Sequence, residues 1–206
     1  MLTFHGSQEL KDQRIAQVRA HRLADQLVKG QYWENGKGCA VACILHSSDH
    51  WLAESELGIP VELFYLTDRI FESLPNGEAM MWPERFLQAI PVGVDLRATH
   101  VNKRFVLGML TDEKRGVMSR IPADDETTRK FTTDVVEFLK QGISEPAPTA
   151  APDALRSMAY LAYFAYLADL ADLADRADRA EILLEVLAAS APITSSPQVA
   201  AAAGER

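Results

Sequence analysis

The sequence predicts an all-α protein, in which a compact multi-helix domain carries an appended long, alanine-rich helix near the C-terminus. Three observations support this fold class. Apolar residues recur at helical spacing, glycine or proline ends most of these stretches, and no convincing alternation of apolar and polar residues indicates a hairpin. The 206 residues, 48% hydrophobic and 24% charged, fit one globular domain with an extension.

The first part of the chain is expected to form a series of helices separated by turn residues. The first helix covers about 9–29 and stops at Gly30, where a C-terminal glycine is expected. The second covers about 38–57, and the third covers 61–74 after Pro60, a favoured first-turn residue. Further helices are expected at 83–90, opened by Pro83, at 99–110, capped by Thr99, and at 124–139.

The proline-rich stretch at 146–152 divides the chain. Prolines cannot continue a helix and favour an extended linker, so residues 1–145 are expected to be the helical core domain. An alanine-rich helix is expected over 153–189, and a disordered tail over 190–206. A straight helix of that length would span roughly 55 Å. It must therefore bend, form a hairpin, or project as a homo-oligomerisation element; the alternative is a docking helix lengthened by triplet repeats.

Composition excludes several function classes. The 21 basic and 29 acidic side chains give a formal charge of −8, which counts against general nucleic-acid binding. The apolar stretch 39–45 is far shorter than the ~20 residues of a membrane span, so no membrane association is expected. No export signal is visible at the start, and the expected compartment is the cytoplasm.

Cys39, Cys43, His46 and His50 form the most notable motif, because steps of four, three and four residues place them on one helical stripe. Cysteine and histidine are usual ligands for zinc and related metals. The stripe is about 16 Å long, so one ion cannot take all four side chains. Either the cysteine pair or the histidine pair would need ligands from elsewhere; candidates are His5, His21, His100, Asp49 and Glu54. The alternative is ordinary packing.

Cys39 is also a candidate catalytic nucleophile. A helix N-terminus and the nearby Lys37 would both favour the thiolate and lower the thiol pKa. The thiolate would need a histidine brought in by the fold. His46, the other catalytic candidate, is followed by Ser47 where a zinc peptidase has glutamate, so peptidase chemistry is not supported.

The loop before Cys39 could instead bind a ligand. Asn35-Gly36 is a strong turn signal, and a helix N-terminus next to Lys37 suits an anion. The phosphate-loop pattern is absent, and a flexible helix start is the alternative. The ligand-binding candidates are Tyr32, Trp33, Asn35, Lys37 and Gly38.

The segments 32–48, 56–60, 68–75 and 82–93 resemble a group of uncharacterised bacterial and phage proteins. The resemblance rests mainly on the motif Trp-Glu-Asn-Gly-Lys-Gly-Cys-Ala-Val-x-Cys, which starts at Trp33. That group also tends to have an alanine-rich helical tail. The resemblance implies no established activity, but small phage-associated helical proteins often bind host components or small signalling molecules.

Two functional hypotheses follow. The first is a non-catalytic binding protein, phage-associated, that engages a protein partner or small ligand through the loop at 32–38 and neighbouring helix ends. The second is a metal- or cysteine-dependent enzyme, with zinc as the candidate metal, centred on Cys39, Cys43, His46 and His50.

Overall fold

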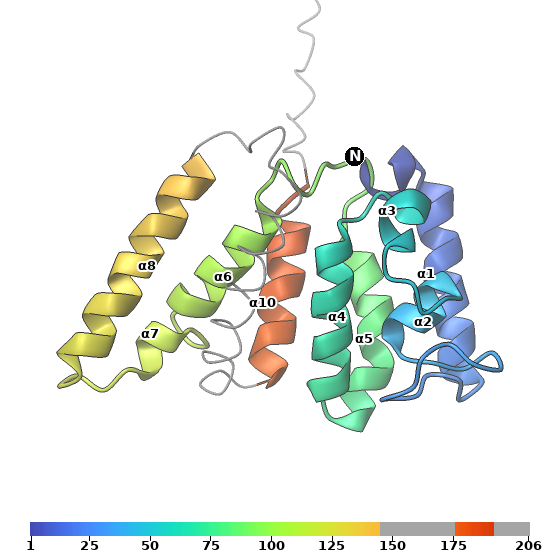
Figure 1. Ribbon diagram of the computed structural model, residues 1–206, viewed down its shortest axis with the longest axis horizontal. Helices are drawn as coiled ribbons and strands as arrows, with labels where there is room; N and C mark the ends of the chain where they lie inside the picture. The colour runs from blue at the N-terminus through green and yellow to red at the C-terminus, as the bar shows by residue number, and fades with distance from the viewer. Residues whose placement is uncertain (145–175, 192–206) are drawn as a thin grey trace, which may run out of the picture.

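The computed structural model describes residues 1–144 and 176–191, and every regular element in these ranges is a helix (Figure 1). The all-α fold class is therefore confirmed. The elements are η1 (Thr3–Gly6), α1 (Gln8–Leu23), α2 (Ala40–Leu45), α3 (Leu52–Leu57), α4 (Val61–Ser73), α5 (Asn76–Ala89), α6 (Val101–Thr111), α7 (Val117–Arg120), α8 (Glu126–Ser144) and α10 (Arg176–Ala188). Within the described ranges, no helix is both long and apolar enough to cross a bilayer.

The helices are arranged in succession along the longest axis of the molecule (Figure 1). α8 lies at one end and packs on α6, α10 packs on α6 and on the α4–α5 pair, and α1 with α2 packs at the other end. The core is continuous through all of these elements. In its centre the buried Trp82 indole donates a hydrogen bond to the Thr67 carbonyl oxygen at 3.1 Å, which satisfies its one polar group.

α10 is part of this core. Ile182, Leu183 and Leu187 are buried, and Gly108 of α6 faces Ile182 so closely that a Cβ there would lie 2.8 Å from the Ile182 Cγ2 atom. The C-terminal end of the predicted alanine-rich helix therefore packs on the domain. The predicted linker at 146–152 and residues 153–175 lie outside the described residues, and homo-oligomerisation through this segment stays a prediction.

The start of the predicted tail also differs from expectation. Ser190 is buried, and its hydroxyl donates to the Val186 carbonyl oxygen at 2.9 Å. This residue completes the packed end of α10. Residues 192–206 of the predicted tail lie outside the described ranges.

Helix boundaries were predicted well in some places and wrongly in others. The predicted 61–74 helix is confirmed as α4, whereas the first helix ends at Leu23, well before residue 29. The chain after it, at Gln26 and Val28, hydrogen bonds to Gly38 through the backbone and so leaves the helix. The predicted helix at 99–110 is α6, but His100, with φ 54°, precedes it in place of a Thr99 cap.

The sequence predicts that Pro83 opens a helix, and this prediction is wrong. Pro83 lies inside α5. The missing N–H and the ring of a mid-helix proline cost helix stability. The burial of Ala79 and Trp82 on the preceding turn offsets this cost, because both side chains are fully buried in the core.

Candidate functional site

The loop before α2 is a short hairpin closed by the predicted turn. Glu34 and Lys37 exchange two backbone hydrogen bonds, each 2.9 Å long, around Asn35 and Gly36. Both central residues have positive φ, 51° and 77°, which is the conformation of a type I′ turn. The Asn-Gly turn signal is therefore confirmed.

Backbone hydrogen bonds fix this hairpin to the rest of the domain. Val28 N–H donates to the Gly38 carbonyl oxygen, Gly38 N–H donates to the Gln26 carbonyl oxygen, and Cys39 N–H donates to that of Gln31. A Cβ at Gly38 would lie 2.6 Å from the Ala42 Cβ, so the hairpin packs tightly on α2. The Gly38 and Cys39 N–H groups, which lead into α2, therefore already have acceptors and are not free to bind an anion.

The five predicted ligand-binding residues do not form one surface, because some are exposed to solvent and others point into the domain. Tyr32 is 73% exposed, and Asn35 and Lys37 are also exposed on the hairpin. Gly38 is buried, and Trp33 turns inward, where its ring stacks on the His46 ring with 4.8 Å between centroids. The hairpin thus presents Tyr32 outward and uses Trp33 for packing.

The predicted helix over 38–57 is wrong, because the chain breaks after α2. His46 adopts the left-handed conformation with φ 52°. The following turn is held by side chains: Asp49 N–H donates to Ser47 Oγ and Trp51 N–H donates to Asp49 Oδ1, both at 3.0 Å. Serine and aspartate compete for backbone groups in this way and favour turns over helix interiors.

This break separates the cysteines from the histidines. Cys39 lies just before α2, Cys43 lies within it, and both thiols are buried and free. The Cys43 Sγ donates to the Gly38 carbonyl oxygen at 3.5 Å. Burial raises the pKa of both thiols to about 12, and the neighbouring Asp68 carboxylate adds to the shift at Cys39. The low thiol pKa predicted for Cys39 is wrong, because burial outweighs the helix N-terminus.

His50 lies against α4. Its ring stacks on Tyr65 with centroids 4.7 Å apart, and its Nε2 is 3.9 Å from the Asp68 Oδ2. The Asp68 carboxylate raises the pKa of His50 above its ordinary value. Tyr65 and Asp68 are three residues apart, so both side chains project from the same face of α4.

His46 pairs with a residue of α1 instead. Its Nε2 lies 2.7 Å from the Nε2 of His21, and the two rings are nearly perpendicular, at 89°. The His21 Nδ1 lies 2.6 Å from the Gln26 Oε1. Burial, followed by electrostatic repulsion from His21 and Arg14, lowers the pKa of His46.

The predicted four-residue stripe is therefore distributed among separate environments. His46 and His50 contact different partners, and the cysteine thiols face the domain interior. Among residues 1–144 and 176–191, no three or more histidine, cysteine, aspartate or glutamate side chains are grouped as metal ligands. The sequence reasoning offered His21 as a completing residue but missed Gln26, Tyr65 and Asp68, since tertiary contacts bring these in.

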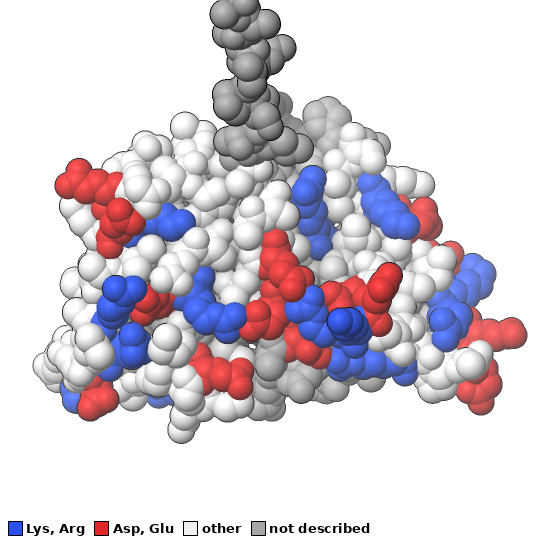
Figure 2. Space-filling view, turned by 180° about the vertical axis from the view of Figure 1, so that it is seen from behind, with Lys and Arg blue, Asp and Glu red and all other residues white. Residues whose placement is uncertain are grey.

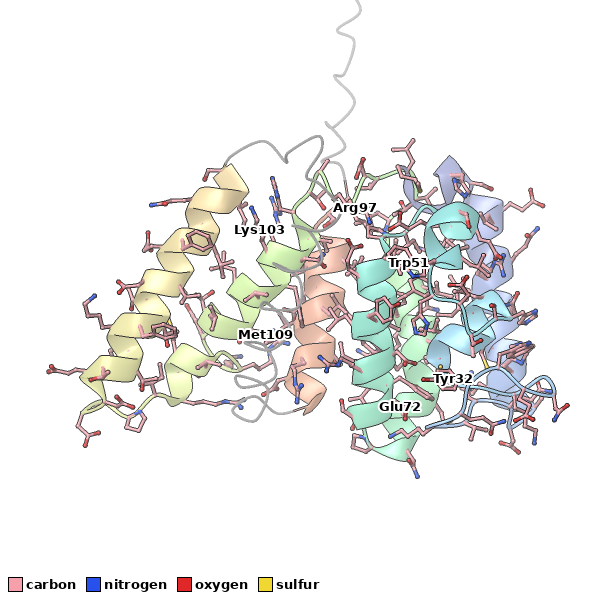
Figure 3. The ribbon with its side chains drawn as sticks, in the orientation of Figure 1. Tyr32, Trp51, Glu72, Arg97, Lys103 and Met109 are labelled. Atoms are coloured by element: carbon pink, nitrogen blue, oxygen red, sulfur yellow. The ribbon has the colours of Figure 1, made fainter. Side chains whose placement is uncertain are left out.

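Two further aromatic side chains are exposed on the same part of the molecule. Trp51, at the start of α3, is 65% exposed, and Tyr65 of α4 is 41% exposed. Figure 3 shows Tyr32 and Trp51 in the half of the molecule formed by α1–α5, away from α8. Tyr32, Trp51 and Tyr65 are called the aromatic surface below.

Comparison of the chain with protein-family models, with curated proteins and with solved structures gives no match.

Proposed function

We propose that the protein is a non-catalytic binding protein that engages a partner protein through the aromatic surface. The observation that carries the proposal is the exposure of Tyr32 and Trp51, which precede and follow α2 in the chain and lie in segments held by hydrogen bonds at Gln31, Glu34 and Trp51. Tyrosine and tryptophan are enriched at protein interfaces, where they supply much of the binding energy. A preformed backbone lowers the entropy lost on association.

The chemistry of the buried cysteines supports binding over cysteine-dependent catalysis. Thiols with a pKa near 12 stay protonated at neutral pH, and a protonated thiol is not the nucleophile. Neither thiol is solvent-exposed. The motif that suggested an enzyme is better explained as the packing of α2 against the hairpin.

The shape and charge of the surface favour a protein partner. Small-molecule sites enclose most of the ligand, whereas the Tyr32 and Trp51 rings project mainly into solvent. Figure 2 shows the molecule from behind, and on that face basic and acidic side chains are interleaved. The net charge of −8 likewise disfavours nucleic acid. We further propose a cytoplasmic setting and a host protein as the partner, as the resemblance to phage-associated proteins implies.

A variant comparison tests the proposal. Immobilised wild-type protein and the double variant Tyr32→Ser/Trp51→Ser are exposed to lysate, and bound proteins are quantified by mass spectrometry. We expect a protein retained by the wild type to be lost from the double variant, while the variant keeps the wild-type unfolding temperature. Phe138→Ser on α8, a residue 74% exposed, is the matched control and should retain that protein.

Retention of every captured protein by the double variant would contradict the proposal. Loss of binding in Phe138→Ser but not in the double variant would also contradict it, because the interface would then lie on α8. Because all three substitutions are at exposed positions, each should alter the free energy of unfolding by no more than about 0.5 kcal/mol.

A further inference from the structure

His21 and His46 bring two imidazole nitrogens to one point on the surface. Their Nε2 atoms are 2.7 Å apart, and they come from the last turn of α1 and from the residue after α2. His46 is exposed and His21 half-buried, so the pair is accessible from solvent. Neither histidine is one of the three residues of the aromatic surface.

The hydrogen bond between His21 and Gln26 leaves the Nε2 atom of His21 available as a metal ligand. The Gln26 Oε1 is an acceptor, so the His21 Nδ1, 2.6 Å away, carries a proton and donates it. In the neutral imidazole the lone pair is then on Nε2, the atom that faces His46. Histidines that bind metal commonly donate their other ring N–H to an oxygen acceptor in this way.

Trp33 holds both rings in place. It stacks on His46, with 13° between the ring planes, and meets His21 edge-on with centroids 5.5 Å apart. The two Nε2 atoms at their present separation need one hydrogen between them. Because His21 carries its proton on Nδ1, that hydrogen belongs to the His46 Nε2. A cation that accepts both lone pairs can take its place once His46 carries its proton on Nδ1 instead and the two rings tilt.

The separation of the nitrogens favours one coordination geometry. Two ligands at ~2.0 Å from a metal lie ~2.8 Å apart when they subtend a right angle and ~3.3 Å apart at the tetrahedral angle. The observed 2.7 Å is a hydrogen-bond separation, and it needs less widening to reach the right-angle value than the tetrahedral value. Cu²⁺ and Ni²⁺ prefer such tetragonal or square-planar arrangements and bind imidazole well, whereas Zn²⁺ prefers tetrahedral sites.

We propose that His21 and His46 bind one divalent transition-metal ion with right-angle coordination, of the Ni²⁺ or Cu²⁺ type, with water completing the shell. Gln26 is the positioning residue for His21. This site uses only one histidine of the predicted stripe and needs neither cysteine.

The test is Ni²⁺ titration of untagged protein, followed by calorimetry and by tryptophan fluorescence. We expect about one Ni²⁺ per chain, with affinity falling as pH falls because the ligands must be unprotonated. His46→Asn and His21→Asn should each lower the affinity at least about tenfold, and Gln26→Met about tenfold. His100→Asn is the matched control, since His100 has φ 54° and His46 has φ 52°, and it should bind like the wild type.

Two spectroscopic measurements test whether the bound ion lies at His21 and His46. Paramagnetic Ni²⁺ should quench the emission of Trp33, and Trp33→Phe should abolish the quenching without abolishing Ni²⁺ uptake. The electron paramagnetic resonance spectrum of the Cu²⁺ form should show coupling to two imidazole nitrogens. Equal affinity of His21→Asn, His46→Asn and His100→Asn, quenching that persists in Trp33→Phe, or a spectrum without two imidazoles would each overturn the proposal.

Discussion

His46 and His50 belong to one sequence motif, yet their surroundings move their pKa values in opposite directions. The Asp68 carboxylate stabilises the charged form of His50, whereas burial and repulsion by neighbouring basic side chains destabilise the charged form of His46. Four residues of separation along the chain place them on opposite sides of a turn, against α4 and α1. Identical side chains therefore contribute to stability with opposite pH dependence.

The first prediction follows from these signs. Because the folded-state pKa of His50 is raised, its contribution to the free energy of unfolding is full below the unfolded value of 6.5 and lost as pH rises through the folded pKa. The contribution of His46, whose pKa is lowered, is present above 6.5 and lost as pH falls through the folded pKa. His50→Gln should thus lose most stability relative to wild type at acidic pH, and His46→Asn at neutral pH.

Denaturant unfolding of the wild type and both variants, from about pH 5 to about pH 8, measures this difference. Parallel stability profiles for the two variants would show that the assigned partners do not act on these imidazoles.

The second prediction concerns two glycines. Gly38→Ala should lower the free energy of unfolding by about 1–3 kcal/mol, because its Cβ would lie 2.6 Å from the Ala42 Cβ and 3.3 Å from the Trp33 backbone. Gly77→Ala is the control: its Cβ meets nothing within 4 Å, and in α5 it should gain up to about 1 kcal/mol of helix propensity. Equal effects in urea unfolding would contradict the close packing of the hairpin on α2.

At the scale of elements, the sequence predicted helices more reliably than their ends. Periodicity identified α4 and α6 because each buries a regular apolar face. It failed at His46, where the Ser47 and Asp49 side chains compete for the backbone, although those residue types were a readable turn signal. It also failed at Pro83, since core burial decided the boundary of α5.

The candidate site was predictable only in part, for the same reason. The Asn-Gly hairpin turn depends on two adjacent residues and was visible in the sequence. The contacts of His46 with His21 and of His50 with Asp68 depend on the packing of α1 and α4, which no spacing along the chain specifies. The thiol pKa values were missed because burial is a tertiary property.

The packing of α10 on α6 gives the third prediction. Gly108→Ala should destabilise the protein by about 1–3 kcal/mol, because its Cβ would lie 2.8 Å from the Ile182 Cγ2 atom. Ile182→Ala removes that atom, so the added cost of Gly108→Ala should shrink in the Ile182→Ala background. A double-mutant cycle in chemical denaturation measures this coupling. Strict additivity would indicate that α10 does not lie on α6.

At the scale of the whole molecule, the charged side chains join helices through ion pairs and do not favour binding to a polyanion. Ion pairs such as Arg85–Glu181 and Arg115–Glu185, both 2.7 Å, join α10 to its neighbours, and charges of both signs share the face seen in Figure 2. Attraction to a polyanion requires clustered positive charge. The formal charge of −8 and the interleaved charges on the face seen in Figure 2 both disfavour it.

The fourth prediction is therefore that duplex DNA is not retained at physiological salt. Fluorescence anisotropy of a labelled duplex at about 0.15 M salt should stay unchanged across micromolar protein concentrations. Saturable binding whose affinity falls steeply with added salt would contradict the assignment of a protein partner.

The most direct test of the central claim is hydroxyl-radical footprinting of the protein alone and in complex with the partner it captures. We expect oxidation of Tyr32 and Trp51 to fall on complex formation, whereas oxidation of Phe138 on α8 should not change. Unchanged oxidation of Tyr32 and Trp51 in a saturated complex would contradict the claim that the aromatic surface is the binding site.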